Sequence, residues 1–284
     1  MLIKRKSIEA QANTMKGPRK TTTGPAMAEE KPLRTRKVKF APINLSEHNG
    51  VRYLHFGSEW VQGAMRVARP DQVELTYVQQ MLAPLLFQTQ PQHIVQLGLG
   101  SAALTKFCYR YLPETRVTAI ELNPEVIAVC HSMFKLPQND ARLQVIQMDA
   151  ADYVEDVANH ASCDILQVDL YDAAARGPVL DSQEFYRACA ACLTPHGVLS
   201  VNLFGEHPSY KKNLQALRAV FPLVLSLPAV AEGNVVVVAF KKRQALDFAA
   251  ITTRASQLQS QTKLPAKSWL PDLQACNATN TSEN

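Results

Sequence analysis

The 284-residue sequence contains no run of 18 or more apolar residues, and its N-terminus lacks the apolar middle of a secretory signal. We therefore expect neither a membrane span nor export, and by elimination a cytoplasmic protein. Six cysteines are scattered along the chain, with no second closely spaced pair that would complete a zinc site. Cys189 and Cys192 have the spacing of a redox motif but lie within a helix-like run, which favours buried packing. We expect no metal site.

The formal charge of +5 is unevenly distributed along the chain. Residues 1–40 hold 11 Lys or Arg against 3 Asp or Glu, whereas the remaining residues hold 19 against 22. The first segment is rich in Lys, Thr, Gly and Pro, a composition that predicts a disordered basic tail. Three interpretations of it stay open: a solvated extension or mis-set start, weak nucleic-acid attachment, and an organelle presequence.

Beyond the tail, strand-like and helix-like runs alternate, which predicts βα units and a mostly parallel sheet covered by helices. An apolar pattern at three- and four-residue spacing also predicts a helix over 74–87. The expected strands cover residues 93–100, 116–122, 143–149, 163–169, 197–204 and 234–240, with one more in "FPLVLSLP". The expected segments are a basic tail (1–40), a small N-terminal β region with a hairpin (41–69), a nucleoside-binding catalytic domain (70–242), a C-terminal helix (243–263) and a polar tail (264–284).

The first two strands of this series end in groups that suit a nucleoside. In open parallel sheets the ligand lies beyond the carboxyl ends of the strands. Strand one ends at Gly98 and Gly100, where glycines permit a tight turn and a close approach to a ligand. Strand two ends in Glu121, 23 residues past Gly98, a spacing typical of an acidic side chain that binds ribose hydroxyls. A cap for the helix beginning at Pro124 is the structural alternative for Glu121.

The next two strands end in aspartates. Strand three ends in Asp149, whose carboxylate would accept an adenine amino group, while Asp152 is expected to cap the following helix. Strand four, "DILQV", is followed by Asp169 and Asp172. Each of these carboxylates alone could be a loop or cap residue. Their joint occurrence with the glycine pair at one sheet edge favours a nucleoside-binding site.

A dinucleotide-binding oxidoreductase is a competing interpretation, because Gly98, Gly100 and Ala103 fit the G-x-G-x-x-A variant of that fingerprint. Two observations argue against it. The later aspartates are not part of that fingerprint, and no separate substrate domain remains to be assigned.

The segments "HIVQLGLGSAALTKF", "VTAIELNPEVIAV", "LQVIQMDAADYV" and "DILQVDLYDA" resemble the spermidine synthase (polyamine aminopropyltransferase) family, in a divergent spermidine-synthase-like branch, over about residues 50–242. The resemblance implies the class I S-adenosylmethionine-dependent methyltransferase fold, a Rossmann-like α/β architecture with a seven-stranded, mostly parallel sheet. The D-x-x-D after strand four is the part of the match most particular to aminopropyl transfer.

This resemblance implies transfer of an aminopropyl group from decarboxylated S-adenosylmethionine, a co-substrate and not a prosthetic group, to a small amine or polyamine. The glycine loop with Ser101 would hold the donor, and Glu121 and Asp149 would bind its ribose and adenine. Asp172 would act as the base that deprotonates the attacking amine, because an ammonium is not a nucleophile. Asp169 would position the ammonium.

Further site residues follow from the same resemblance. Gln62 would contact the donor, Tyr171 would line the pocket, and Gln79 and Gln80 would contact the acceptor; a homodimer is also expected by analogy. The chain departs from the family in two places, with Ser101 where the loop usually has Asp, and Val78-Gln79-Gln80 where Tyr-His-Glu is usual. Both changes remove a carboxylate that would bind an ammonium, so the acceptor can differ from that of authentic synthases.

Two other functions remain open at this point. One is a methyltransferase that uses intact S-adenosylmethionine, since Ser101 would repel the carboxylate of that donor less than Asp would. The other is a nucleoside-binding or scaffold protein that has kept the fold and lost catalysis.

Overall fold

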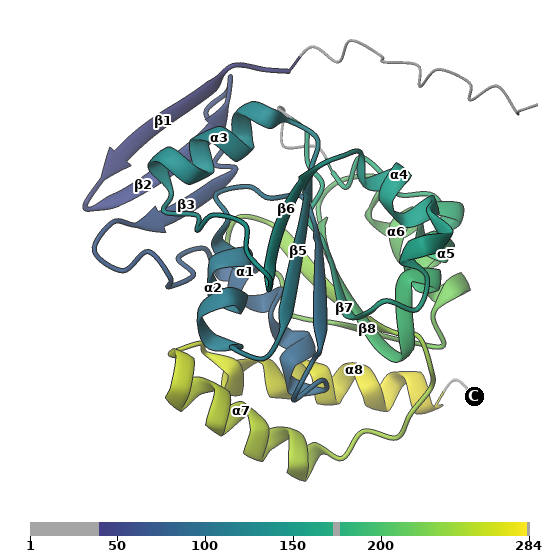
Figure 1. Ribbon diagram of the computed structural model, residues 1–284. Coiled ribbons are helices and arrows are strands. Elements are labelled where there is room, and N and C mark those ends of the chain that lie inside the picture. Colours follow the sequence, from purple (N-terminus) through teal and green to yellow (C-terminus); the bar gives the residue numbers. More distant parts are fainter. Residues whose placement is uncertain (1–39, 173–176, 283–284) are drawn as a thin grey trace, which may run out of the picture. The chain divides into compact units, whose positions relative to one another are not determined.

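A computed structural model describes residues 40–172 and 177–282 of the chain, with the side chains beyond 278 left undescribed. Residues 1–39, nearly all of the predicted basic tail, therefore lie outside the described residues. The described residues form a seven-stranded sheet flanked by helices and a separate three-stranded sheet (Figure 1).

The seven-stranded sheet has the order β6-β5-β4-β7-β8-β10-β9. Its first five strands run parallel, whereas β10 is antiparallel to both β8 and β9. The mostly parallel α/β fold predicted from the sequence is therefore confirmed. The strands are β4 (His93–Leu97), β5 (Arg116–Glu121), β6 (Leu143–Gln147), β7 (Cys163–Val168), β8 (Leu193–Phe204), β9 (Leu223–Ser226) and β10 (Asn234–Phe240).

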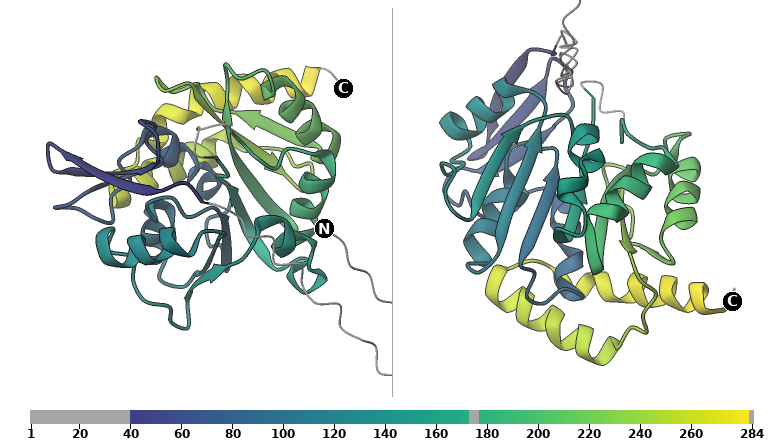
Figure 2. Two further views of the ribbon diagram at one scale, coloured as in Figure 1. Left: turned by 90° about the horizontal axis from the view of Figure 1, so that it is seen from above. Right: turned by 45° about the vertical axis from the view of Figure 1, so that its right-hand side comes forward.

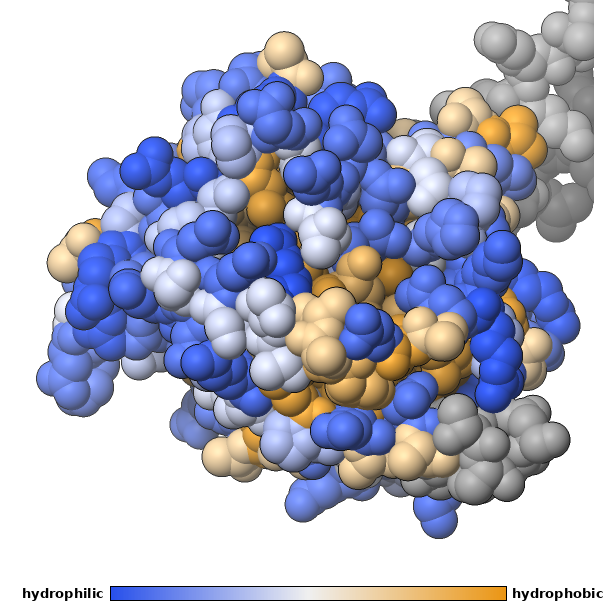
Figure 3. Space-filling model, turned by 90° about the horizontal axis from the view of Figure 1, so that it is seen from below, coloured by the Kyte–Doolittle hydropathy of each residue, from blue (hydrophilic) through white to orange (hydrophobic). Residues whose placement is uncertain are grey.

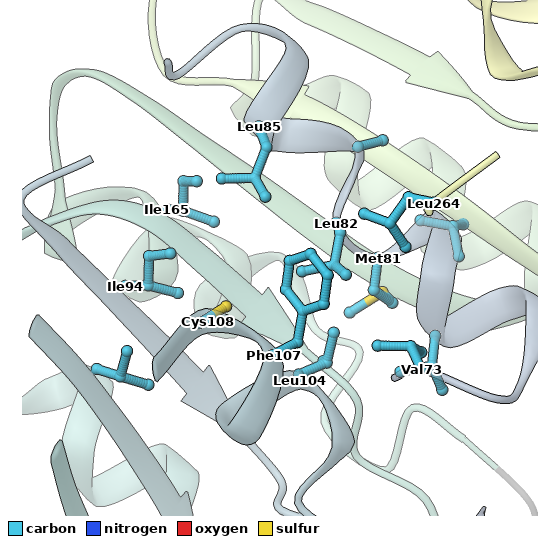
Figure 4. Close-up of a cluster of buried hydrophobic side chains, with 14 of the residues drawn as sticks. Val73, Met81, Leu82, Leu85, Ile94, Leu104, Phe107, Cys108, Ile165 and Leu264 are labelled. Atoms are coloured by element: carbon cyan, nitrogen blue, oxygen red, sulfur yellow. The ribbon is translucent and has the colours of Figure 1, made fainter. Parts of the chain in front are cut away.

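Helices cover both faces of this sheet (Figure 2). Alternate side chains of the central strands enter two apolar clusters, so that Ile94 of β4 packs in one and Val95 in the other. The first cluster includes Met81, Leu85 and Phe107 (Figure 4). Its helices are α2 (Ala103–Tyr111), α3 (Pro124–Met133) and α7 (Phe248–Thr262); those of the second are α4 (Ala150–Glu155), α5 (Gln183–Cys192) and α6 (Tyr210–Val220). Cys189 and Cys192 are buried on α5, as their apolar context predicts.

The helix predicted over 74–87 is interrupted. The structure has a short helix α1 (Thr76–Gln80) followed by a 3₁₀ turn η1 (Ala83–Leu86). Pro84 lies at the start of η1. Because proline lacks a backbone N–H and its ring collides with the preceding turn, one continuous helix cannot pass through it. The apolar side chains keep their inward direction on both pieces.

The N-terminal β region has three strands where a hairpin was predicted. The predicted hairpin corresponds to β2 (Val51–Phe56) and β3 (Gly63–Arg66), and β1 (Ile43–His48) pairs along the outer edge of β2. Five of the six residues of β1 are exposed, so the strand lacks the apolar alternation by which a sequence signals a half-buried strand. The homodimer expected by analogy stays a prediction.

The predicted polar tail at 264–284 is wrong for most of its length. Residues Ala266–Trp269 form a 3₁₀ turn (η3), and Leu270–Ser282 form helix α8, which packs on β9. Leu264, Trp269 and Leu273 are buried, so a few widely spaced apolar residues anchor a segment whose average composition is polar. Figure 3 views the molecule from below and shows apolar residues gathered among polar ones on this face. Among the described residues, no helix combines the length and the apolar character that a membrane crossing requires.

The two tryptophans test whether the C-terminal segment is part of the core. Trp269 is 2% exposed and Trp60 is 56% exposed. We expect Trp269→Ala to lower the free energy of unfolding by about 3–5 kcal/mol because it leaves a cavity, and Trp60→Ala to change it by no more than about 0.5 kcal/mol. Urea denaturation followed by circular dichroism measures both. Equal effects of the two variants would contradict the packing of η3 and α8 against the sheet.

Candidate active site

The loop after β4 passes unusually close to the loop after β7. Gly98 (φ 95°) and Gly100 (φ 51°) both have left-handed backbone conformations. A Cβ atom on Gly98 would lie 2.3 Å from the carbonyl oxygen of Asp169. The amide of Asp169 also donates to the carbonyl of Leu97. Only glycine fits at position 98, and the two loops therefore share one wall of the site.

Glu121, the last residue of β5, ties its strand to the glycine loop. Its carboxylate accepts from the backbone N–H of Leu99 (3.1 Å) and of Asn123 (2.8 Å). Burial raises the pKa of Glu121, and these backbone hydrogen bonds work against the rise. The side chain of Asn123 accepts from the N–H of Glu125 and caps α3. Glu121 is therefore not a helix cap, and its carboxylate is oriented at the edge of the glycine loop.

Asp149 caps a helix at the end of the next strand. Its side chain accepts from the N–H of Ala151 at 2.9 Å, at the start of α4. The expectation that Asp152 caps this helix is wrong, because Asp152 lies inside its first turn. A carboxylate has several lone pairs, so the cap and contact with an adenine amino group are compatible. The adenine role of Asp149 stays a prediction.

Ser101 attaches the glycine loop to the small sheet. Its side chain is buried, and its hydroxyl donates to the carbonyl of Ala64 in β3 at 3.1 Å. A Cβ atom on Gly63 would lie 2.6 Å from Ser101, so the two backbones are closely packed. The hydroxyl proton thus has a main-chain partner, and the predicted contact of Ser101 with a donor remains untested.

Gln62 lies between the two site loops. Its side-chain amide donates to the main-chain carbonyl of Asp172 at 3.2 Å. The main-chain carbonyl oxygen of Gln62 would lie 3.0 Å from a Cβ atom on Gly100. The segment before β3 therefore covers the glycine loop and holds the D-x-x-D loop at Asp172, the last described residue before 177. The predicted contact of Gln62 with the donor stays a prediction.

Asp169 is the carboxylate that the protein perturbs most clearly. Burial raises its pKa from the ordinary 3.8 to about 6, and a side-chain hydrogen bond from Asn202 works against that rise. The Nδ2 group of Asn202 donates to Oδ1 of Asp169 at 2.9 Å. Asn202 lies near the end of β8 and is 1% exposed. The carboxylate is thus ionised at neutral pH but accepts a proton readily.

Two phenols accompany Asp169. Tyr171 donates from its hydroxyl to the main-chain carbonyl of Asn202 at 3.2 Å, and burial next to Asp169 raises its pKa. Burial also raises the pKa of Tyr77 on α1, as do the nearby charges of Asp169 and Glu232. Tyr77 was not predicted from the sequence, because it lies beside the apolar stripe of its helix and only the fold brings it to the D-x-x-D loop.

The two glutamines of α1 have different environments. Gln79 donates from its amide to the carbonyl of Val73 at 2.8 Å. Gln80 is 3% exposed and donates to the carbonyl of Pro228 at 3.1 Å, in the loop between β9 and β10. Within the described residues, the Oε1 atom of Gln80 is buried without a hydrogen-bond partner. Of the pair, Gln80 is the one with an acceptor atom still to be satisfied.

A family profile and a curated relative indicate the same family. The sequence profile described as "Spermine/spermidine synthase domain" matches residues 45–250. A polyamine aminopropyltransferase of Neisseria meningitidis is 35% identical over 253 residues, which are 87% of this chain and 95% of that protein.

Solved structures of low sequence identity share the fold. A probable spermidine synthase from Corynebacterium glutamicum has a TM-score of 0.64 at 19% identity, over 75% of this chain and 83% of that one. Human methyltransferase-like protein 13, solved in complex with SAH, has a TM-score of 0.59 at 24% identity, over 67% of this chain and 93% of that one. These two likenesses support the methyltransferase-like fold alone.

The close approach at Gly98 gives a prediction with a matched control. Gly50 also has a positive φ, 72°, but nothing lies within 4 Å of the Cβ atom that alanine would add there. We expect Gly50→Ala to lower the free energy of unfolding by about 1 kcal/mol from backbone strain alone. Gly98→Ala should lower it by at least about 2 kcal/mol more, because two main chains must move apart. Urea denaturation of both variants measures the difference, and equal losses would refute the collision.

Proposed function

The chain belongs to the spermine/spermidine synthase family, and from this premise we propose that it transfers an aminopropyl group from decarboxylated S-adenosylmethionine to an amine. In this reaction the acceptor nitrogen attacks the propyl carbon next to the sulfonium. The new C–N bond forms as the C–S bond breaks, and the electron pair of that bond goes to sulfur. The products are methylthioadenosine and an aminopropylated amine, and the proton lost from nitrogen goes to a base.

The donor nucleoside would lie over the glycine loop. Gly98 and Gly100 keep the backbone free of side chains there, and the carboxylate of Glu121 is aimed at the same loop by the N–H of Leu99. An oriented carboxylate can accept from both hydroxyls of a ribose. Asp149 lies at the end of the next strand, where an adenine amino group would donate to it. This arrangement supports binding of the nucleoside part of the donor.

A carboxylate beside the sulfonium would take the proton from the amine. The family resemblance implies Asp172 as this base, and the pH experiment below tests it against Asp169. The structure supplies an argument for Asp169, because this carboxylate is enclosed, held in one orientation by Asn202 and raised in pKa to about 6. A base with a pKa just below the working pH is ionised and can still receive a proton. We propose Asp169 as the base and Asp172 as the partner that holds the ammonium.

The acceptor would lie between α1 and the loop after β9. Tyr77 and Gln80 are three residues apart on α1, so they share one helix face. The nearby charges of Asp169 and Glu232 help to raise the pKa of Tyr77, and the amide of Gln80 donates to the carbonyl of Pro228. The Oε1 of Gln80, which has no partner within the part of the chain that the structure describes, can accept a hydrogen bond from an ammonium group. These residues support an acceptor amine whose far end is bound through neutral and phenolic groups.

Methyl transfer from intact S-adenosylmethionine is the second candidate function. The specific observation that favours it is Ser101, whose neutral hydroxyl stands where the family usually has a carboxylate and is engaged with Ala64. A carboxylate at that place would repel the carboxylate of the intact donor. The D-x-x-D after β7 favours the aminopropyl reaction.

We expect the purified protein to release methylthioadenosine from decarboxylated S-adenosylmethionine only when an amine is present. The acceptor, drawn from a panel of diamines and triamines, should gain one aminopropyl group by mass spectrometry, because each turnover forms one C–N bond. Reactions without acceptor and reactions with Asp169→Asn are the controls. Methylated products and SAH from the intact donor would instead establish the second candidate, and no product from either donor would refute transfer.

The pH dependence distinguishes the two carboxylates. A base must be ionised, so wild-type kcat/KM should fall as pH drops below the pKa of Asp169, about 6. We expect Asp169→Asn to lower kcat about 10²–10⁴-fold. Its residual rate should rise about tenfold per pH unit up to the pKa of the amine, because only free amine then reacts.

Asp172→Asn should raise the acceptor KM and keep the fall in rate near pH 6 that Asp169 produces. Steady-state kinetics over the range from acid to alkaline pH measure both variants. The reverse pattern, with the acid fall kept in Asp169→Asn and lost in Asp172→Asn, would assign the base to Asp172.

A further inference from the structure

Asn202 holds two residues of the candidate active site at once. Its side-chain Nδ2 donates to Oδ1 of Asp169 at 2.9 Å, and its main-chain carbonyl accepts from the hydroxyl of Tyr171 at 3.2 Å. The remaining polar atom of its side chain, Oδ1, accepts from Nδ2 of Asn234 at 3.0 Å. The nearby Asn234 side chain lowers the pKa of Tyr171, against the rise that burial causes. The chain of contacts Asn234–Asn202–Asp169 therefore runs from β10 through β8 to the loop after β7.

The pairing of β8 with β10 produces this arrangement. Asn234 lies opposite Phe204 in the antiparallel register, and Asn202 is two residues before Phe204. Opposite residues of an antiparallel pair share a face, as do residues two apart on one strand. Asn234 and Asn202 are thus diagonal neighbours on one face of the sheet, at a separation that their amides can bridge. The contact is a consequence of strand register and needs no loop to form it.

Asn234 determines which end of the Asn202 amide meets Asp169. An amide side chain can present either its carbonyl oxygen or its NH₂ group to a neighbour. Because Asn234 donates to Oδ1 of Asn202, the NH₂ group must be directed at Asp169. Without Asn234, the amide could turn so that its carbonyl oxygen accepts a hydrogen bond from protonated Asp169. The asparagine of β10 therefore excludes the orientation that would favour the neutral acid.

We propose that Asn234 is a positioning residue that acts through Asn202 to keep the Asp169 carboxylate ionised and aimed at the reacting amine. The role as an aid to catalysis rests on the proposed function, whereas the effect on Asp169 itself does not. Asn234 contacts no reacting atom in this scheme. Asn234 holds the Asn202 amide so that its NH₂ group donates to the Asp169 carboxylate from a fixed direction.

Among the described residues, the other groups near Asp169 do not supply this donor. Tyr77 on α1 and Tyr171 in the same loop have raised pKa values, so both are neutral phenols at neutral pH. Glu232, in the loop between β9 and β10, lies close enough to Tyr77 to raise its pKa, and Asp172 follows in the same loop as Asp169. A negative charge on Glu232 or Asp172 would favour the protonated form of Asp169. Among the described residues, the hydrogen bond from the Asn202 amide is the contact that lowers the pKa of Asp169.

Asn234→Leu removes the donor and keeps the approximate size and shape of the side chain. We expect the pKa of Asp169 to rise by about 0.5–1 unit, in line with the effect of losing a hydrogen bond to the charged form. The direct measurement is a pH titration of ¹³C-labelled aspartate carboxyls by NMR, with the Asp169 signal assigned from its loss in Asp169→Asn. The acid fall of kcat/KM with decarboxylated S-adenosylmethionine and the accepted amine should move to higher pH by the same amount.

Two further variants separate positioning from folding. Asn234→Gln keeps an amide donor and should restore the Asp169 titration at least in part. Asn139→Leu removes another asparagine amide, one that bridges the N–H and carbonyl of Val145 away from the site, and should leave the titration unchanged even where it lowers stability. Urea denaturation of each variant shows which of them remain folded. If Asn234→Leu does not fold, Asn234→Gln is compared with Asn234→Ser. The glutamine keeps an amide donor and should therefore shift the Asp169 titration measurably less than the serine does.

An Asp169 titration that is identical in wild type, Asn234→Leu and Asn234→Ser would overturn the inference. A wild-type protein without transferase activity would instead refute the proposed function, and the NMR titration would still decide whether Asn234 acts on Asp169. A shifted titration with an unshifted rate profile would overturn the catalytic part alone.

Discussion

The candidate active site depends on the contact between the backbone of Gly98 and the carbonyl of Asp169. β4 and β7 are parallel neighbours at the centre of the sheet, so their carboxyl ends emerge side by side. The space between these ends is too small for a Cβ atom, which would lie 2.3 Å from the carbonyl oxygen. This approach brings the glycine loop and the D-x-x-D loop to one place. The contacts of Glu121 and Gln62 then fasten the neighbouring elements to that pair of loops.

Placing carboxylates in such an enclosed edge opposes stability. Burial raises the pKa of both Glu121 and Asp169. A carboxyl group whose pKa is higher in the folded than in the unfolded state contributes most to stability at low pH, and that contribution is lost as pH rises through the folded value. For Asp169, a rise from 3.8 to about 6 corresponds to about 3 kcal/mol at neutral pH. The extensive apolar packing on both sheet faces must offset this cost.

The fold and the strand ends could be predicted because each signal is local. Apolar runs, a glycine pair and terminal carboxylates lie within a few residues of one another, and parallel strands bring their ends together. The helix cap is Asp149, about one turn before Asp152, where it was wrongly expected. The position of a cap depends on where the backbone enters the helix. Pro84 divided a helix whose apolar spacing was correct. Tyr77, Asn202 and Asn234 carry no local signal, because only strand register and helix packing bring them to Asp169.

The amides at this site have a common physical role. Gln62 donates a hydrogen bond to the main-chain carbonyl of Asp172. Asn202 donates to the Asp169 carboxylate, and Asn234 donates to the amide oxygen of Asn202. An amide can fix the direction of a carboxylate without cancelling its charge, whereas Lys or Arg would pair with it and lower its affinity for a cation. A site for a sulfonium donor and an amine needs negative charge that remains available. Among the described residues, the amide of Asn202 gives Asp169 such a neutral donor, which suits the proposed reaction.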